Sequence, residues 1–292
     1  MKISSAFTGS LLREHRVTVQ WRDTMNYAAA VRDGNPLYFD DERPSGIIAP
    51  PMFCVTLTWP VSENLGKNIQ ATDFPDEYLS TMVHYTEHLQ FYRPVVPGDR
   101  IVINGKIAAI RSHWTGTHII LRFDAADDQG QPVFTEHIGG LLRRVECEGK
   151  SAHSFEVPEI RRLKKWSEPA EFKRFIDLDP FQTFIYDGCA NMFFPIHTSV
   201  KFARSVGVSG IIVQGTATLA MAVREITNGF ADADPRRIRT IACRFTDMVI
   251  PGSRITIEAA SAENKDGLKP VHFFVKNKNG KRAVSDGLVM IG

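Results

Sequence analysis

Apolar and polar residues alternate along two stretches of the chain that share one layout. Residues 90–103 (QFYRPVVPGDRIVI) and 244–257 (RFTDMVIPGSRITI) each carry a Pro-Gly-[Asp/Ser]-Arg step between alternating apolar positions. A period of two is typical of half-buried strands, and Pro-Gly marks a turn. Each stretch therefore predicts two strands joined by a turn, and each half several antiparallel strands. DQG at 128–130 and KNG at 278–280 predict one further hairpin turn in each half.

A long apolar helix is predicted between the helical motif and the strands of each half. Residues 216–226 (TATLAMAVREI) would be apolar around nearly the whole helix, and an apolar run also follows residue 53. Such a helix must be covered on several sides, and a sheet curled around it would do that. The pattern predicts an α+β fold.

The two halves are an internal duplication. Tyr38 matches His197, and Pro36 matches Pro195. The matching pairs of segments are 27–38 (YAAAVRDGNPLY) with 186–197 (YDGCANMFFPIH), 45–53 (SGIIAPPMF) with 209–217 (SGIIVQGTA), and 90–103 with 244–257. Because a missed repeat leads to a wrong fold, this match organises the chain. We expect one unit at 1–150, a linker at 151–172 containing RRLKK and SEPAEF, and a second unit at 173–292.

Composition limits the possible partners. The 292 residues contain 35 Lys and Arg against 33 Asp and Glu, so no strong basic field would attract nucleic acid or an anionic membrane. Charged residues precede any apolar run that could form a signal peptide, and no later stretch approaches a membrane span. The four scattered cysteines indicate reduced thiols. We expect a cytoplasmic protein that binds a small molecule or another protein.

These motifs resemble the MaoC-like, or R-specific, enoyl-CoA hydratases and dehydratases in their fused double hot-dog form. DGNPLYFDD, GIIAPP and FYRPVVPGDR make the first half similar to the FAS1-like dehydratase N-terminal region of that family. FPIHTSVKFA and GIIVQGTATLA make the second half similar to the MaoC domain. The resemblance covers nearly the whole chain. It implies two hot-dog units, each a long central helix wrapped by an antiparallel sheet.

The resemblance also implies a catalytic site in the second half. The family motif G-D-x-N-P-[LI]-H supplies an Asp and a His as the acid/base pair, and this His falls on His197. The glycine whose N–H binds the thioester oxygen falls on Gly215. Water addition builds charge on that oxygen, so a fixed N–H there stabilises the transition state. An imidazole can exchange the proton.

Both halves depart from the family motif. The first half keeps Asp33, but Tyr38 replaces the His and Pro51, which has no N–H, replaces the glycine. We expect that half to be catalytically silent and to widen the acyl pocket. In the second half Met192 stands at the Asp position. A carboxylate would have to come from Asp187 or from Asp33, or His197 would act alone; Asp33 is more typical of a residue that caps its own turn.

Other residues are candidates for substrate contact. Met192 and Phe194 would form an apolar wall suited to a bulky acyl group, and Gln214 and Tyr38 are further candidates. RRLKK or PRRIR (235–239) would be either solvated surface or a site for the phosphates of CoA.

Metal and cofactor chemistry is not indicated. His84 and His88 are spaced for chelation on a helix, but the alternating pattern around them predicts a strand, where they lie about 13 Å apart at about 3.3 Å per residue. Cys189 has no thiolate-stabilising neighbour in sequence. No Gly-rich loop has the spacing of a phosphate-binding turn. We expect no cofactor and no metal, with the CoA thioester as substrate.

The sequence thus predicts an acyl-CoA lyase that hydrates a 2-enoyl-CoA or dehydrates a 3-hydroxyacyl-CoA. Two alternatives stay open. One is an acyl-CoA thioesterase, because one fold can host several reactions. The other is a non-catalytic acyl-CoA-binding subunit of a hydratase complex, which the absent Asp favours. In each case we expect a homo-oligomer or a partner subunit.

Overall fold

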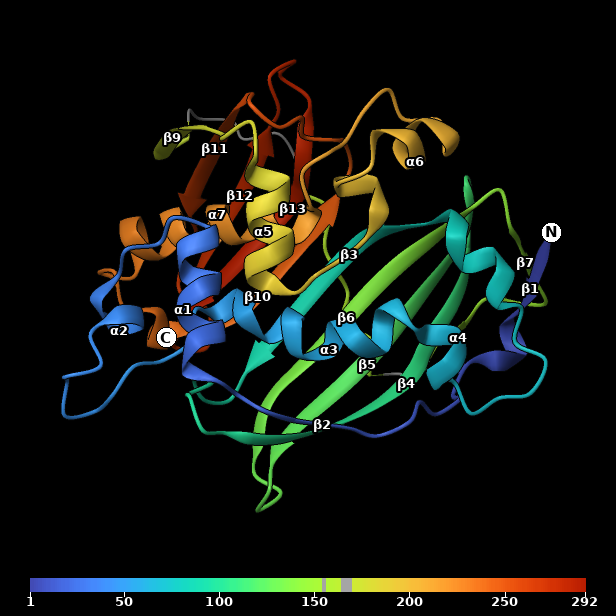
Figure 1. Ribbon diagram of the computed structural model, residues 1–292, viewed down its shortest axis with the longest axis horizontal. Helices are drawn as coiled ribbons and strands as arrows, with labels where there is room; N and C mark the ends of the chain where they lie inside the picture. The colour runs from blue at the N-terminus through green and yellow to red at the C-terminus, as the bar shows by residue number, and fades with distance from the viewer. Residues whose placement is uncertain (154–155, 164–169) are drawn as a thin grey trace.

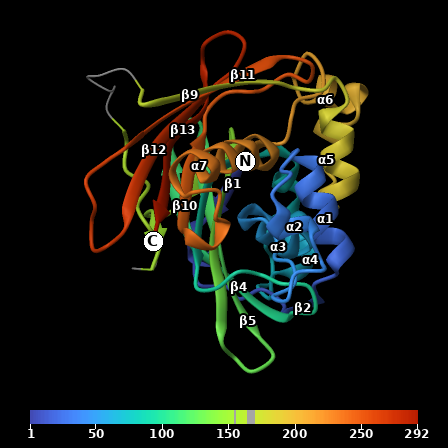
Figure 2. The ribbon, with the colours of Figure 1, turned by 90° about the vertical axis from the view of Figure 1, so that its left-hand side faces the viewer.

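One antiparallel sheet runs through both halves of the protein and curls around its helices. The computed structural model describes residues 1–153, 156–163 and 170–292. Ten strands follow one another in the order β2-β4-β5-β6-β3-β10-β13-β12-β11-β9. In Figure 2 the helices lie on one side of this sheet, and the outer strands β9 and β2 curl over and under them. The sheet thus provides the cover that the apolar helices require.

Each half contributes five strands to this order. The strands of the first half are β2 (His15–Thr18), β3 (Met82–Phe91), β4 (Arg100–His113), β5 (Gly116–Asp127) and β6 (Pro132–Arg143). The strands of the second half are β9 (Phe172–Asp177), β10 (Ile238–Phe245), β11 (Arg254–Ser261), β12 (Lys269–Lys276) and β13 (Arg282–Ile291). Short strands complete the first half: β8 (Ala152–His153) pairs with β4, and β1 (Lys2–Ser4) pairs with β7 (Glu146–Glu148).

The helices also come in matching sets. The first half has α1 (Trp21–Ala30), α2 (Pro36–Phe39), α3 (Cys54–Glu63), α4 (Leu65–Asn68) and the 3-10 turns η1 (Ser5–Phe7), η2 (Pro51–Phe53) and η3 (Asp76–Thr81). The second half has α5 (Gln182–Ala190), α6 (Val200–Ser205), α7 (Gly215–Phe230) and the 3-10 turns η4 (Pro195–His197) and η5 (Pro235–Arg237). α1 and α5 pack against each other, and α3 and α7 are the central helices (Figure 1).

The halves are joined by β3 and β10, which pair antiparallel with His88 opposite Ala242. The two segments that match in sequence around these strands differ by 154 residues in number, and so do His88 and Ala242. The pair therefore lies on the approximate two-fold axis of the duplication. Each strand also has an irregularity at the same place, between His84 and Thr86 and between Ile238 and Thr240.

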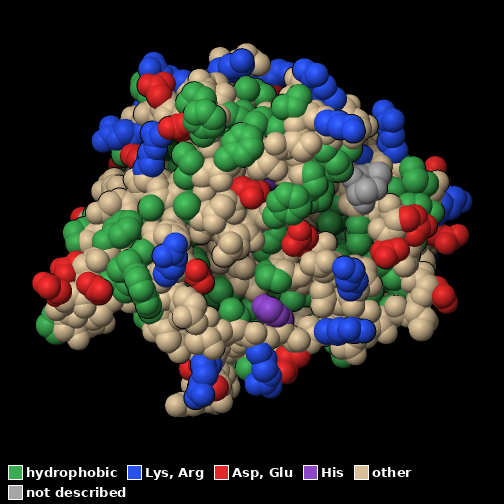
Figure 3. Space-filling model, in the orientation of Figure 1, with side chains coloured by type: hydrophobic (Ala, Val, Ile, Leu, Met, Phe, Trp, Pro, Cys, Tyr) green, Lys and Arg blue, Asp and Glu red, His purple; other side chains and the backbone are tan. Residues whose placement is uncertain are grey.

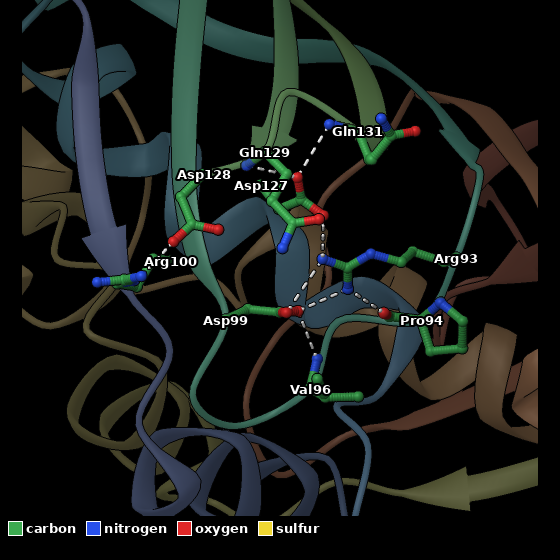
Figure 4. A network of polar contacts seen from close by, with 9 residues as sticks. All are labelled: Arg93, Pro94, Val96, Asp99, Arg100, Asp127, Asp128, Gln129 and Gln131. Atoms are coloured by element: carbon green, nitrogen blue, oxygen red, sulfur yellow. Dashed lines mark hydrogen bonds and ion pairs between the residues drawn. The ribbon is translucent and has the colours of Figure 1, made fainter.

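The predicted turns are present and are held by side chains. Asp127 accepts hydrogen bonds from the backbone N–H groups of Gln129 and Gln131 at the β5–β6 turn. Arg93 donates to Asp99 in the Pro-Gly-Asp-Arg turn at 2.8 and 3.0 Å and to Asp127 at 3.4 Å, so one guanidinium ties the two turns together (Figure 4). The hairpin turns predicted at 128–130 and 278–280 are thus confirmed, because β5 pairs with β6 and β12 pairs with β13. The Pro-Gly turns join β3 to β4 and β10 to β11, which are not neighbours in the sheet.

One helix differs from the expectation. The central helix of the second half, α7, has 16 residues, whereas α3 has 10 and contains Pro60. Proline removes a backbone donor and clashes with the preceding turn. The prediction of one long helix is therefore wrong for the first half, where α3 ends at Glu63 and α4 follows.

The predicted linker has both described and undescribed parts. Lys164, Lys165 and 167–169, which belong to RRLKK and SEPAEF, lie outside the described residues. Before them, the N–H of Leu163 donates to Asp286 at 2.8 Å, so the chain contacts the second half at this point. In the described residues, no helix combines the length and apolarity needed to cross a membrane.

Candidate active site

His197 is held in one orientation by the backbone of its own half. After α5 the chain turns through Asn191, which has a left-handed conformation with φ 52°, and then forms η4. His197 Nδ1 lies 2.8 Å from the carbonyl oxygen of Ile212. Because a carbonyl only accepts hydrogen bonds, Nδ1 carries the proton and Nε2 of the neutral ring carries a lone pair.

The environment keeps this imidazole neutral. Burial lowers the pKa of His197 to about 4, against an opposing effect of the Ile212 carbonyl, and the charge of His84 lowers it further. At neutral pH the ring therefore has the state that a general base requires.

Gly215 is the first residue of α7. The N–H groups of the first helical turn have no partner within the helix and point outward from its positive end. A Cβ placed on Gly215 would lie 3.1 Å from two ring carbons of Phe245. The φ angle of Gly215 is outside the left-handed region. Close packing against Phe245 therefore explains the glycine at this position, and a positive φ does not.

The Asp position of this motif is filled by a buried methionine. Met192 is 5% exposed, and its sulfur accepts contacts from the hydroxyl groups of Tyr186 at 3.6 Å and Thr216 at 3.9 Å. Phe194 lies beside His197, with ring centroids 6.4 Å apart. The candidates Met192 and Phe194 thus come from the same turn as His197.

Gln214 immediately precedes α7 and is buried. Its side-chain amide donates to the carbonyl of Thr183 at 3.0 Å. Its Oε1 is buried and has no hydrogen-bond partner in the part of the chain that the structure describes. This candidate therefore links the start of α7 to α5.

The first-half motif lies against α7 instead of beside His197. Asp33 accepts a hydrogen bond from the N–H of Asn35 at 3.3 Å, and burial raises its pKa. Asp33 also borders a hollow of about 670 Å³ together with Arg224 of α7. Tyr38 is 1% exposed and packs near the same helix. Asp33 therefore caps its own turn and faces a different space.

Asp187 points elsewhere. It lies on α5, burial raises its pKa, and its charge acts on Glu63 at the end of α3. Among the described residues, no hydrogen bond or ion pair joins Asp187 or Asp33 to His197. Neither of the two carboxylates considered from the sequence is in contact with this imidazole.

Sequence reasoning missed a group of titratable side chains from the first half. The irregularity of β3 at Tyr85 turns His84 onto the inner face of the sheet, where Glu87 also lies. His84 Nε2 is 3.1 Å from Glu87 Oε2. Glu136 of β6 shares this face, and Glu87 and Glu136 are both fully buried. The signal available in the sequence was His-x-x-Glu on an apolar strand, but alternation alone places the two residues on opposite faces.

Burial controls the protonation of this group. It raises the pKa of Glu87 and of Glu136 well above the usual range, and their mutual interaction adds to the rise for Glu136. Burial lowers the pKa of His84 to about 4. Protons are therefore retained on the carboxyl pair while the imidazole stays neutral.

His84 and His88 do not share a site. The strand prediction for their segment is confirmed, and His88 lies on the opposite face, where its ring centroid is 6.0 Å from that of His137. Within the described ranges, no three His, Cys, Asp or Glu side chains are grouped to hold a metal ion.

The basic segment at 235–239 has partners of its own. Arg236 pairs with Asp234 at 2.8 Å and Arg237 pairs with Asp232 at 2.5 Å. These ion pairs favour the solvated-surface interpretation over a phosphate site. The upper part of the face in Figure 3 shows hydrophobic side chains over α5 and the following turn, where Phe181, Phe184 and Phe193 are exposed.

Comparison with known proteins assigns both halves. Residues 165–281 match the family described as MaoC like domain, and residues 6–136 match the FAS1-like, dehydratase domain region. A UPF0336 protein of Streptomyces avermitilis is 31% identical over 128 residues, which cover 42% of this chain and 82% of that protein.

Two further relatives extend the match. Probable enoyl-CoA hydratase 2 of Dictyostelium discoideum is 25% identical over 212 residues, covering 72% of this chain and 70% of that protein. Fatty acid synthase beta subunit pkiC of Emericella nidulans is 34% identical over 95 residues, covering 32% of this chain. The matched part is only 5% of that subunit, so this similarity concerns one region of a much larger protein.

Solved structures share the fold. A MaoC-like dehydratase from Phytophthora capsici superimposes with a TM-score of 0.81 at 19% identity, covering 97% of this chain and 96% of that chain. Peroxisomal multifunctional enzyme type 2 from Drosophila melanogaster gives a TM-score of 0.75 at 17% identity, covering 97% of this chain and 48% of that chain. With the antiparallel sheet described above, these similarities confirm the α+β double hot-dog fold.

Proposed function

This chain belongs to the MaoC-like dehydratase family in its double hot-dog form, and on that premise we propose that it hydrates a 2-enoyl-CoA or dehydrates a 3-hydroxyacyl-CoA. The reaction takes place at the second-half motif, with His197 as the acid/base. The substrate is the CoA thioester, and the acyl group is bulky. The named relatives support a hydratase or dehydratase, and the choice of substrate is our proposal.

One observation carries the proposal: the 2.8 Å hydrogen bond from His197 Nδ1 to the Ile212 carbonyl. It leaves Nε2 with a lone pair on a neutral ring. In hydration, Nε2 takes a proton from water as the water oxygen bonds to the β-carbon. The same nitrogen then returns the proton to the α-carbon, so a single water is added and no charge is left over.

The start of α7 is suited to bind the thioester oxygen of the substrate. As the carbon–oxygen bond forms, the electron pair of the double bond moves onto the thioester oxygen. The N–H of Gly215 at the positive end of a 16-residue helix would stabilise that charge. Ile212, whose carbonyl orients His197, is only three residues away, so one short segment positions both groups. Phe194 and Met192 would line the acyl side of the same turn.

The first half lacks the two groups to which we assign catalysis in the second half. Pro51 at the matching position of the first half has no N–H, and Tyr38 is buried against α7. We propose that this half forms the wall of a wide acyl site and that its own copy of the motif carries out no chemistry.

The test is turnover of a panel of 2-enoyl-CoA and 3-hydroxyacyl-CoA thioesters with short, branched, aromatic and steroid-like acyl groups. The sharpest variant is His197→Asn, because the Asn amide can still donate to the Ile212 carbonyl but has no counterpart of Nε2. We expect turnover to fall by about 100-fold to 10,000-fold. Asp33→Asn is the matched control in the silent motif, and we expect it to keep activity within a few-fold.

Two results would overturn the proposal. Release of free CoA from saturated thioesters, abolished by His197→Asn, would identify a thioesterase. Tight thioester binding without turnover, until a second protein is added, would identify a binding subunit.

A further inference from the structure

The proposed reaction needs a second group that the motif does not supply. Hydrogen bonds from both O–H groups of the reacting water fix the direction of its attack. The methionine at position 192 cannot accept a strong hydrogen bond. The site therefore lacks the acceptor that a motif Asp would provide. The question is which other side chain faces the same space.

We propose that the first half completes the second-half site: His84 accepts the second O–H of the reacting water, and Glu87, backed by Glu136, fixes the orientation of the His84 ring. This inference rests on the proposed function and deepens it. It assigns His84 as a catalytic residue, while Glu87 and Glu136 are positioning residues because they act through His84.

A short series of contacts brings His84 to the site. The His84 and Phe245 ring centroids are 4.5 Å apart. Phe245 is also the side chain against which Gly215 packs. His84 is close enough to His197 for its charge to lower the pKa of His197. The His84 ring and the start of α7 therefore contact the same aromatic ring, and His197 lies within electrostatic reach of His84. The His84 side chain is 22% exposed, so solvent reaches it.

The orientation of His84 follows from its partners. Its Nε2 forms a hydrogen bond with the carbonyl oxygen of Thr86 at 3.1 Å and lies 3.1 Å from Glu87 Oε2, an ion-pair distance without hydrogen-bond geometry. A backbone carbonyl can only accept, so Nε2 carries the proton and Nδ1 carries the lone pair. Nδ1 is then the nitrogen available to accept from water. Partners of this kind, one contact away from the reacting group, commonly fix a histidine tautomer.

Burying the two carboxyl groups destabilises the fold, and the matching strand of the second half carries apolar residues instead. Glu87 and Glu136 are fully buried, and in the described residues neither pairs with Lys or Arg. In the second half, the positions 154 residues after His84 and Glu87 are Ile238 and Ile241, both buried. The half whose motif kept its His thus has apolar residues in its own strand β10, and the polar strand β3 belongs to the half whose motif lost its His. The polar strand faces the motif that kept its His.

The step balances with this arrangement. One water O–H is held by His84 Nδ1 and remains on oxygen in the product. The other O–H breaks, its proton goes to His197 Nε2, and the water oxygen bonds to the β-carbon. The double-bond pair moves to the thioester oxygen and then accepts the proton from His197 at the α-carbon. His84 ends unchanged, and no co-reactant is needed.

The test compares three variants of β3. His84→Leu removes the acceptor, and we expect kcat to fall by about 100-fold with KM nearly unchanged. Glu87→Ile copies the second half and removes the ring support, for an expected fall of about tenfold, in the range of outer-shell partners. Glu87→Gln keeps an acceptor oxygen and should restore most of kcat. His88→Asn, on the opposite face of the same strand, is the matched control and should leave kcat unchanged.

A second measurement does not depend on turnover. Nitrogen-15 NMR of the substrate-free protein reports which nitrogen of His84 carries the proton. We expect Nε2–H in the wild type and also in Glu87→Ile, where the Thr86 carbonyl still accepts from Nε2. A wild-type His84 protonated on Nδ1 would overturn the inference, and so would an unchanged kcat in His84→Leu. A wild-type protein without hydratase activity but with the expected tautomer would instead overturn the proposed function.

Discussion

The phenolic oxygens of Tyr27 and Tyr186 lie 3.1 Å apart in the interior, and each tyrosine opens its copy of the repeat. Both side chains are fully buried, on α1 and α5. Because Tyr186 donates its hydrogen to Met192, Tyr27 must be the donor between the two phenols. The two copies of the duplicated motif therefore meet through matching side chains.

This direction of donation predicts unequal effects on stability. Tyr186→Phe leaves the Tyr27 hydroxyl buried without an acceptor, for an expected cost of about 1–3 kcal/mol in the free energy of unfolding. Tyr27→Phe leaves Tyr186 with its Met192 contact and should cost about 1 kcal/mol or less. Urea unfolding of both single variants and the double variant measures this difference. Tyr92→Phe, with a 46% exposed side chain, is the control. Equal costs would contradict this direction of donation, and a larger cost for Tyr27→Phe would show that the donors are reversed.

The fold could be predicted because its signals are local. Alternation marked β3, β4, β10 and β11, and Pro-Gly marked the turns before β4 and β11. The pairing of the two copies was not predicted: β3 and β10 pair with His88 opposite Ala242, which are 154 residues apart like the matched segments beside them. The 10-residue length of α3 does not follow from the match to the second half, because α7 has no counterpart of the helix-breaking Pro60.

The proposed site could be predicted only where its residues share one motif. His197 and Gly215 came from segments matched to a family pattern. His84 and Glu87 come from the other half, and one irregular residue in β3 puts them on the same face. A period-two pattern without that irregularity separates them. Contacts across halves and single-residue bulges leave no periodic signal, so the sequence alone could not bring His84 and Glu87 together.

Gly215→Pro tests whether the backbone N–H of Gly215 is needed, as distinct from the small size of glycine. Proline is well tolerated at the first residue of a helix, and Gln214 before it already has the extended conformation that proline requires. The variant copies Pro51 of the first half. We expect kcat to fall by about 100-fold to 1,000-fold, as for the loss of one oxyanion donor. Circular dichroism and steady-state kinetics measure the fold and the rate.

Gly215→Ala is the control for this change. It keeps the N–H but places a Cβ 3.1 Å from the Phe245 ring, so a small shift is needed. We expect a loss of no more than about tenfold, because the donor remains. Equal losses in the Ala and Pro variants would assign the effect to crowding against Phe245 and remove the oxyanion role.

Glu87 and Glu136 should make the protein less stable as pH rises. Their folded-state pKa values are raised above the ordinary value, mainly by burial. The folded state therefore binds protons more tightly, and the unfolding free energy falls from the ordinary carboxyl range upward as pH rises toward the folded pKa. The slope is about 1.4 kcal/mol per pH unit for each proton released. The groups that respond to the same charges are His84, Cys54, Cys243, Tyr27 and Tyr186.

The measurement is urea unfolding between pH 7 and pH 9. Histidines with lowered pKa values, such as His84 and His197 at about 4, act below this window and with the opposite sign. Substituting both carboxyls, Glu87→Gln with Glu136→Gln, should flatten the decline in stability. A wild-type stability that stays constant or increases over this range would show that the pair is already ionised in the folded state.

Met192→Asp restores the Asp of the family motif. We propose that His84 has taken over the role of this Asp in the site. The new carboxyl would be buried where two hydroxyls, from Tyr186 and Thr216, already point at the Met192 sulfur. Loss of the methionine packing should still lower the unfolding free energy by roughly 2–5 kcal/mol. In the wild-type background we expect little gain in kcat, because His84 already holds the water.

The Glu87→Ile background gives the stronger comparison. There Met192→Asp should recover most of the lost kcat, because the motif carboxylate supplies the acceptor that a misoriented His84 no longer provides. Met192→Asn has the same size without the charge and should recover less. If Met192→Asp instead raises kcat about tenfold or more in the wild type, the water was poorly held from the start. The role of His84 would then be structural, and the natural methionine at position 192 would lower the catalytic rate without compensation.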